Sequence, residues 1–376
     1  MEINNDYVTN PSSRANGKID SKFTQNLPGD CALLASIFSM AQTEEGAKAI
    51  ENSINIIEDA NGNITKYEVT FDGPDETYTV TQNELEEAKK EGERQYSTGD
   101  DDVTVLELAM EKCFKESDDE KLKEILNNYP KLSDDVLNNV NPSSVTYLLA
   151  DETLETAYVH SPNKESLTRS FIPQQNYTLK DINGNTITLK EGSLYRPTSI
   201  EGTGESANLV ISYPNSDEKI RVNYDTFINQ VFAKNSKSAS QKTEKLLDNF
   251  EENPNTNVLI FGAPQDATVK GASGEDVTLT TDEAHAFIVS DVKDDNVTLL
   301  NSSNPTVQTT VSKDSLLELD NYWIYGTEKK DDTKAEVIQP KESYSVNTGK
   351  KLKRDSAVLY PNFLAFLKAK IFGLEE

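Results

Sequence analysis

A turn leads straight into an apolar helix near the start of this chain, and a cysteine stands at the junction. Pro28–Asp30 predicts the turn, and Ala32–Phe38 is the apolar run. Cys31 is therefore expected at a helix N-terminus, where free N–H groups and the helix dipole favour a thiolate. Gln25 lies six residues upstream, where a looping chain can return its amide to the sulfur. A nucleophile with a nearby amide donor is the minimum for acyl transfer.

The chain has only two histidines, and one of them has a suitable neighbour. His285 begins the strand-like run Ala286–Val289, and a second run, Val297–Leu300, ends at Asn301. A β-hairpin puts the start of one strand beside the end of the next, so Asn301 is expected near His285. A base with a side chain to orient it completes the logic of a Cys-His-Asn triad. The other histidine, His160, precedes a Ser-Pro turn and is expected on a loop.

These motifs, in this order, resemble the calpain-type, papain-like cysteine peptidases. The chain looks like a divergent, bacterial calpain-like catalytic domain, with similarity in patches from about residue 20 to about residue 327. The resemblance implies an α+β, papain-like two-lobed fold and an endopeptidase that hydrolyses protein or peptide substrates. Cys31 would attack the carbonyl and His285 would carry the proton. Asn301 would hold the imidazole, and Gln25 with the Cys31 backbone N–H would stabilise the oxyanion.

The chain departs from that family at two aromatic positions. Ala32 stands where the family usually has Trp after the nucleophile, and Asn301-Ser302-Ser303 stands where it has Asn-Pro-Trp or Asn-Ser-Trp. The missing aromatics leave the wall of the site and the substrate preference open. Asn304 is a rival for the orienting residue, but Asn301 is preferred because it follows the strand without a gap. Calcium binding is open by resemblance, although no ligand set matches, and no other cofactor is expected.

Each candidate residue also has a plain structural explanation. Cys31 could be a buried structural thiol, and His285 alone would be a satisfied strand histidine. The case for Gln25 over a surface amide rests on the resemblance. Two other functions stay open: an inactive calpain-like interaction module, and a thiol acyltransferase on the same fold. Cys113 is expected to be a plain core or surface thiol on a helix, and the acidic run Asp100–Asp102 is expected in solvent.

Composition bounds the partners of the chain. A net charge of −27 argues against nucleic acid, since phosphates would be repelled. Two cysteines are too few for a disulfide framework, and no run approaches the roughly 20 apolar residues of a membrane span. The polar, acidic start shows no signal sequence. The expected location is therefore cytoplasmic, with export by a route that needs no cleaved signal left open.

The pattern along the chain predicts five segments. Residues 1–20 are expected to be a flexible leader, 21–165 a helical lobe with the nucleophile, and 166–327 a β lobe with the histidine and asparagine. A charged linker, 328–356, and an apolar C-terminal helix, 357–376, follow. That helix is expected to dock on the body or on a partner, and binding to a membrane surface is the weaker alternative.

The β lobe contains a possible repeat. Thr178–Lys180 and Ile187–Leu189 match Thr268–Lys270 and Val277–Leu279 at a constant offset of 90 positions, which puts Tyr195 at the place of His285. One explanation is a duplicated β unit whose first copy lacks the histidine. The other is ordinary hairpin chemistry, in which such sequences recur by chance. Both stay open on the sequence.

Overall fold

The computed structural model describes most of the chain up to residue 327. The described ranges are 15–20, 22–26, 29–90, 96–127, 135–138, 140–160, 171–213, 218–280 and 283–327, with two short strands, β17 (Ser343–Tyr344) and β18 (Lys351–Leu352). The chain divides into two compact units, Met1–Glu328 and Lys329–Glu376. This division falls where the charged linker is expected to begin. The expected helix at 357–376 lies outside the described residues.

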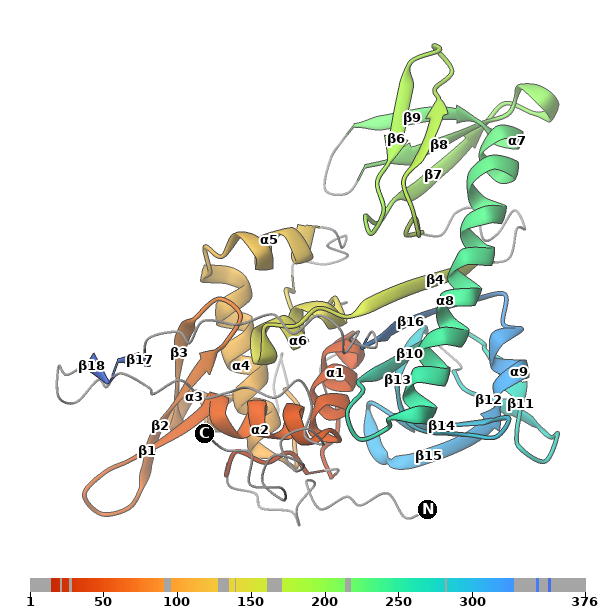
Figure 1. The fold of residues 1–376 in the computed structure, drawn as a ribbon. Coiled ribbons are helices and arrows are strands. Elements are labelled where there is room, and N and C mark those ends of the chain that lie inside the picture. Colours follow the sequence, from red (N-terminus) through yellow and green to blue (C-terminus); the bar gives the residue numbers. More distant parts are fainter. Residues whose placement is uncertain are drawn as a thin grey trace, which may run out of the picture. The chain divides into compact units, whose positions relative to one another are not determined.

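The first half of the first unit is mainly helical (Figure 1). The helices are α1 (Cys31–Ala41), α2 (Glu44–Ser53), α3 (Gln82–Ala88), α4 (Asp101–Glu116), α5 (Glu120–Asn127) and α6 (Pro142–Ala150). A three-stranded antiparallel sheet joins them, formed by β1 (Ile54–Glu58), β2 (Ile64–Phe71) and β3 (Glu76–Thr81). Every residue of α1 after Cys31 is buried, so this helix is held from all sides.

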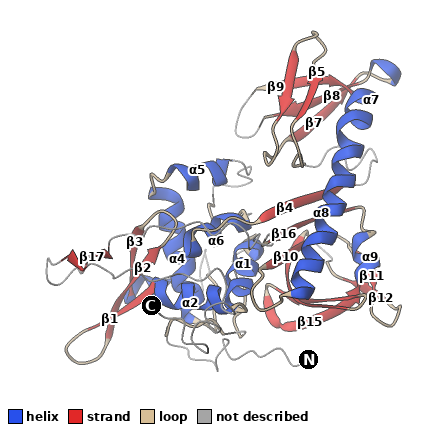
Figure 2. Ribbon diagram, in the orientation of Figure 1, coloured by secondary structure: helices blue, strands red, loops and turns tan. Residues whose placement is uncertain are grey.

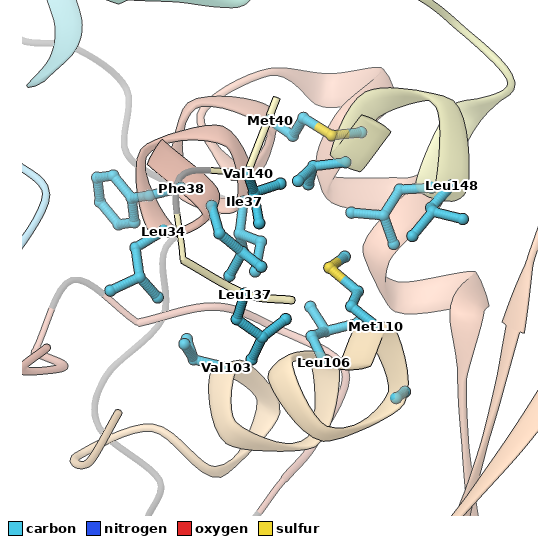
Figure 3. Packing of buried hydrophobic residues seen from close by; sticks show 14 of the residues in the cluster. Leu34, Ile37, Phe38, Met40, Val103, Leu106, Met110, Leu137, Val140 and Leu148 are labelled. Atoms are coloured by element: carbon cyan, nitrogen blue, oxygen red, sulfur yellow. The ribbon is translucent and has the colours of Figure 1, made fainter. Parts of the chain in front are cut away.

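Figure 3 shows how helix α1 is packed. Leu34, Ile37 and Met40 of α1 lie among side chains of α4 and α6, including Leu106 and Leu148. Burying a large aliphatic side chain contributes about 1.5–3 kcal/mol. The residue that begins α1 is therefore fixed by the packing of the whole helix.

The second half is dominated by a six-stranded antiparallel sheet, whose strands are drawn in red in Figure 2. The order of its strands is β15-β14-β13-β10-β16-β4. Its strands are β4 (Glu155–His160), β10 (Leu259–Ala263), β13 (His285–Lys293), β14 (Asn296–Asn301), β15 (Asn304–Ser312) and β16 (Asn321–Gly326). Helix α1 packs on β13 and β10, and the long helix α8 (Ala233–Glu252) packs on β4, β13 and β10. Alternate residues of β13 belong to two different cores, so both of its faces are covered. The α+β class predicted from the sequence is confirmed.

Two features cross the expected lobe boundaries. β4 lies in the segment predicted as helical lobe, yet it is an edge strand of the six-stranded sheet, paired with β16. His160 ends this strand, not a loop as predicted: it is buried, and its Nδ1 lies 3.0 Å from Asn321 Oδ1. Helix α8 falls inside the predicted β lobe. The apolar face of α8, with Leu246 and Phe250, packs against the sheet.

The expected flexible leader is ordered at its end. Within residues 15–20, the Gly17 backbone N–H donates to Asp102 Oδ1 at 2.8 Å. The Asp20 backbone N–H donates to Asp100, which also caps α4 through the Asp102 N–H at 2.9 Å. The run Asp100–Asp102 is thus buried, contrary to the expectation of a solvated run. Its carboxylates satisfy backbone donors of the preceding segment and of the helix start.

A smaller β unit lies between β4 and α8. It consists of a hairpin, β5 (Tyr177–Lys180) and β6 (Thr186–Leu189); a meander, β7 (Arg196–Glu201), β8 (Asn208–Ser212) and β9 (Lys219–Asn223); a 3-10 turn, Gly204–Ser206; and the helical turn α7 (Tyr224–Phe227). A π-helical turn, Ile228–Phe232, leads into α8. The unit has an apolar core of its own, centred on aromatic side chains such as Phe171 and Phe227.

The same order of elements recurs downstream. A hairpin of β11 (Thr268–Lys270) and β12 (Asp276–Thr278) precedes the meander β13-β14-β15 and the short helix α9 (Lys313–Leu317). The two hairpins have the same register. Each meander carries one irregularity in its first strand pair. Asn223 caps α7 and Ser312 caps α9, each by accepting a backbone N–H three residues later. This correspondence favours a duplicated unit over chance hairpin chemistry.

The strand registers change one detail of the repeat. Phe171 pairs with Tyr195 in the first copy of the repeat, as Phe261 pairs with Phe287 in the second copy. Tyr195 therefore corresponds to Phe287, and not to His285 as the constant offset predicts. The loop before the second meander is two residues longer, and a fixed offset cannot detect such an insertion.

Candidate active site

Cys31 is the first residue of α1, as the turn and the apolar run predict. Gly29 has φ of +85°, and a Cβ on it would lie 2.1 Å from Asn138 Oδ1. Only glycine meets both demands without strain, so Gly29 sets where the helix starts. Leu27 and Pro28, the beginning of the predicted turn, lie outside the described residues.

Cys31 is partly buried, and its surroundings disfavour the thiolate. Burial raises the pKa of Cys31 to about 11, against a partial lowering by a hydrogen bond from the Ala286 backbone, and the carboxylates of Asp30 and Glu283 raise it further. The sequence predicts the opposite direction, a lowered pKa, from the helix start alone. Loss of solvent and two nearby negative charges outweigh the helix dipole here. The contact with Ala286 places the sulfur one residue from His285.

His285 begins β13 and lies against the end of β14. Its Nε2 is 2.9 Å from Asn301 Oδ1, which also accepts the Ser303 backbone N–H at 2.8 Å. The donor at Ser303 shows that this atom of Asn301 is the oxygen, so Nε2 must carry the proton that it donates. The lone pair of the neutral ring is then on Nδ1, for which no hydrogen-bond partner lies among the described residues. Burial lowers the pKa of His285, with the Asn301 hydrogen bond opposing it.

Asn304 is engaged elsewhere. Its Oδ1 accepts the Thr306 backbone N–H at 3.2 Å and the Thr306 hydroxyl at 2.6 Å. Between the two asparagines that the sequence leaves open, only Asn301 contacts His285.

Gln25 is held close to His285 and Asn301 by the turn after β14. Its backbone N–H donates to Ser303 O at 3.0 Å, and its side-chain Oε1 accepts the Ser303 hydroxyl. Its side chain also interacts with Asp30, directly before the cysteine. The structure therefore gathers all four candidate residues, Cys31, His285, Asn301 and Gln25, around the Ala286 and Ser303 backbones.

A buried pair of carboxyl groups under the helix start is absent from the sequence prediction. Asp30 and Glu107 are fully buried. Burial raises the pKa of Asp30 to about 7, with opposing interactions from Glu107 and Gln25. Burial and the neighbouring Asp30 raise the pKa of Glu107 well above its usual range. Burial therefore favours the protonated, neutral form of both carboxyl groups, and the only sequence signal was Glu107 on the apolar stretch of α4.

The arrangement combines a thiol, a neutral imidazole with a free lone pair, and an amide that orients it. This combination suits acyl transfer with the imidazole as general base. Among the described residues, no group of three or more His, Cys, Asp or Glu side chains is arranged to hold a metal ion. No described helix is long and apolar enough to cross a membrane. Cys113 is a buried thiol on α4.

No family model, curated protein or solved structure gives a significant match to this chain.

Proposed function

We propose that this chain is a cysteine endopeptidase of papain-like, two-lobed architecture that acts on protein or peptide substrates. The observation that carries the proposal is the 2.9 Å contact between His285 Nε2 and Asn301 Oδ1, beside a cysteine sulfur that is hydrogen-bonded to the Ala286 backbone. The nucleophile begins a helix of the first half, whereas the base and its orienting amide come from the six-stranded sheet. A substrate cleft between two such parts is common.

The charge states of the site favour a general-base route. The resting thiol and imidazole are both neutral near pH 7, because burial raises the pKa of Cys31 and lowers that of His285. In the proposed reaction His285 Nδ1 takes the thiol proton as the sulfur bonds to the carbonyl carbon. The imidazolium then protonates the leaving amine as the C–N bond breaks, and water releases the acyl group by the reverse proton path.

The test measures peptide hydrolysis and covalent labelling together. A protein substrate such as casein and a peptidyl chloromethyl ketone are given to the wild type, Cys31→Ala, His285→Ala and the double variant. We expect the adduct on Cys31, no hydrolysis by either single variant, and no further loss in the double variant, because residues that act as a unit are not additive. Cys113→Ala is the matched thiol control and should keep activity. Hydrolysis retained by Cys31→Ala would refute the proposal.

A second candidate, an inactive interaction module, is favoured by two observations. The Cys31 pKa of about 11 leaves almost no thiolate at neutral pH. Ala32 and Ser303 also stand where the resembled peptidases carry aromatic side chains. Absence of hydrolysis, together with equal, slow labelling of Cys31 and Cys113, would support this function instead.

A further inference from the structure

Ser303 connects the two supporting side chains of the site. It lies in the turn between β14 and β15 and makes three hydrogen bonds, and its hydroxyl also lies 3.4 Å from His285 Nε2. Its backbone N–H donates to Asn301 Oδ1 at 2.8 Å, its carbonyl oxygen accepts the Gln25 N–H at 3.0 Å, and its hydroxyl donates to Gln25 Oε1.

The hydroxyl contact decides which way the Gln25 amide faces. An amide oxygen that accepts from Ser303 must lie on that side, so Nε2 with its two protons lies on the other. The same side chain lowers the pKa of nearby Asp30, although neither Asp30 carboxyl oxygen has a hydrogen-bond partner among the described residues. Gln25 is thus held at its backbone N–H and at its amide oxygen by Ser303, and an amide fixed in this way is a pre-organised donor for a developing oxyanion.

Ser302, the residue before Ser303, has different contacts. The Ser302 hydroxyl donates to Ala286 O at 2.7 Å and lies 3.2 Å from His285 Nε2. Ser302 is fully buried, whereas Ser303 is only partly buried. Of the two serines in this turn, Ser303 is the one that reaches Gln25.

We propose that Ser303 is a positioning residue that orients the Gln25 amide through its hydroxyl and so couples the oxyanion donor to the His285–Asn301 pair. This inference rests on the proposed peptidase function. It assigns a role to the position where the resembled peptidases carry tryptophan. Because the backbone contacts of Ser303 survive substitution of its side chain, the hydroxyl can be tested alone.

The first test is kinetic. Ser303→Ala should lower kcat by roughly 10- to 10²-fold with KM little changed, less than the roughly 10²- to 10³-fold expected on losing one oxyanion donor. Ser303→Thr, which restores a hydroxyl, should recover most of the loss. In a Gln25→Ala background Ser303→Ala should cause no further loss. Iodoacetamide labelling of Cys31, which needs no oxyanion donor, should be unchanged. An effect that adds fully to Gln25→Ala would overturn the proposal.

A second measurement separates this inference from the proposed function. The Gln25 side-chain NH₂ resonances, identified by their loss in Gln25→Ala, should be dispersed in the wild type and move toward random-coil values in Ser303→Ala. If the wild type hydrolyses no peptide, the peptidase proposal fails, but the resonance still shows whether Ser303 orients Gln25. Unchanged resonances in Ser303→Ala would refute the orienting contact, whatever the activity.

Discussion

At the scale of single residues, burial controls the charge of both Cys31 and His285. Labelling of Cys31 by iodoacetamide should therefore be slow at pH 7 and rise up to pH 10 and beyond, because burial raises its pKa to about 11. A free cysteine reaches half its maximal labelling rate at a pH equal to its usual pKa, about 8.5. The measurement is the rate at Cys31 by peptide mass spectrometry from pH 6 to 10.5 in the Cys113→Ala variant. A plateau below pH 8 would contradict this and restore the thiolate expected from the helix start.

Substitution of Asn301 and of Asn304 should affect kcat very differently. Asn301→Ala removes the acceptor of the His285 Nε2–H and should lower kcat by about 10², a typical contribution of a well-positioned general base. Asn304→Ala removes only contacts to Thr306 and should leave kcat within about 2-fold, like most surface substitutions. Steady-state hydrolysis of one peptide decides between them. A crippled Asn304→Ala with a normal Asn301→Ala would reverse the assignment of the orienting residue.

The sequence could indicate which residues meet, but not their charge states. Cys31 was predictable from the turn and apolar run beside it, and Asn301 from the end of its strand. The direction of the Cys31 pKa shift depends first on burial by residues far along the chain, and to a smaller degree on the carboxyl groups of Asp30 and Glu283. Such long-range burial has no local signature. Ser303 was visible only as a missing aromatic, because its partner Gln25 is 278 positions away.

At the scale of elements, local periodicity predicted the helix starts and hairpins better than the lobe boundaries. The hairpin at Thr268 was predictable because turn residues and alternation lie within a few positions. The edge strand β4 was not, since its partner β16 begins at Asn321, far downstream. Helix α8 has an apolar spacing, with Ala239, Thr243, Leu246 and Phe250 buried, but its remaining residues are mostly polar.

Strand β10 contains a glycine that its neighbour requires. Gly262 lies opposite Trp323 of β16, and a Cβ on it would be 1.8 Å from the indole ring. Gly262→Ala should destabilise the protein by about 1–3 kcal/mol, a usual cost of overpacking. Trp323 is the only tryptophan, so its emission reports directly on the displacement. Urea unfolding followed by fluorescence measures both. An unchanged emission maximum and an unchanged midpoint would show that the two strands part more easily than their packing implies.

At the scale of the whole molecule, buried acids link stability to pH. Burial raises the pKa of Asp30 and of Asp100 to about 7 and that of Asp102 to about 6. At a pH between the usual pKa of a carboxyl in the unfolded chain and these raised pKa values, the folded state holds protons that the unfolded state has lost. Stability should therefore fall as pH rises from about 4 toward 7, by about 1.4 kcal/mol per pH unit for each such proton.

Urea midpoints at pH 5.5, 6.5 and 8 measure this slope. Glu107→Gln supplies a neutral group that never ionises, so it should lessen the slope and raise the midpoint most at pH 8. Glu120→Gln, at the exposed start of α5, is the matched control and should not change the slope. A wild-type midpoint that rises with pH over this range would show that the buried carboxyls are ionised at little cost.

The place where the catalytic part ends can be argued from the sheet. β16 lies between β10 and β4, and Thr327 closes it by donating its N–H to Val258 O at 3.0 Å. A chain ending at Thr327 keeps every strand of this sheet, so it should unfold cooperatively and hydrolyse peptide as the full chain does. A chain ending at Asp320 lacks an interior strand and exposes the edges of two others, so it should not fold. Circular dichroism melts and one peptide assay compare the three proteins. If the chain ending at Thr327 also fails to fold, the second unit belongs to the catalytic part, and the division at residue 328 has no functional meaning.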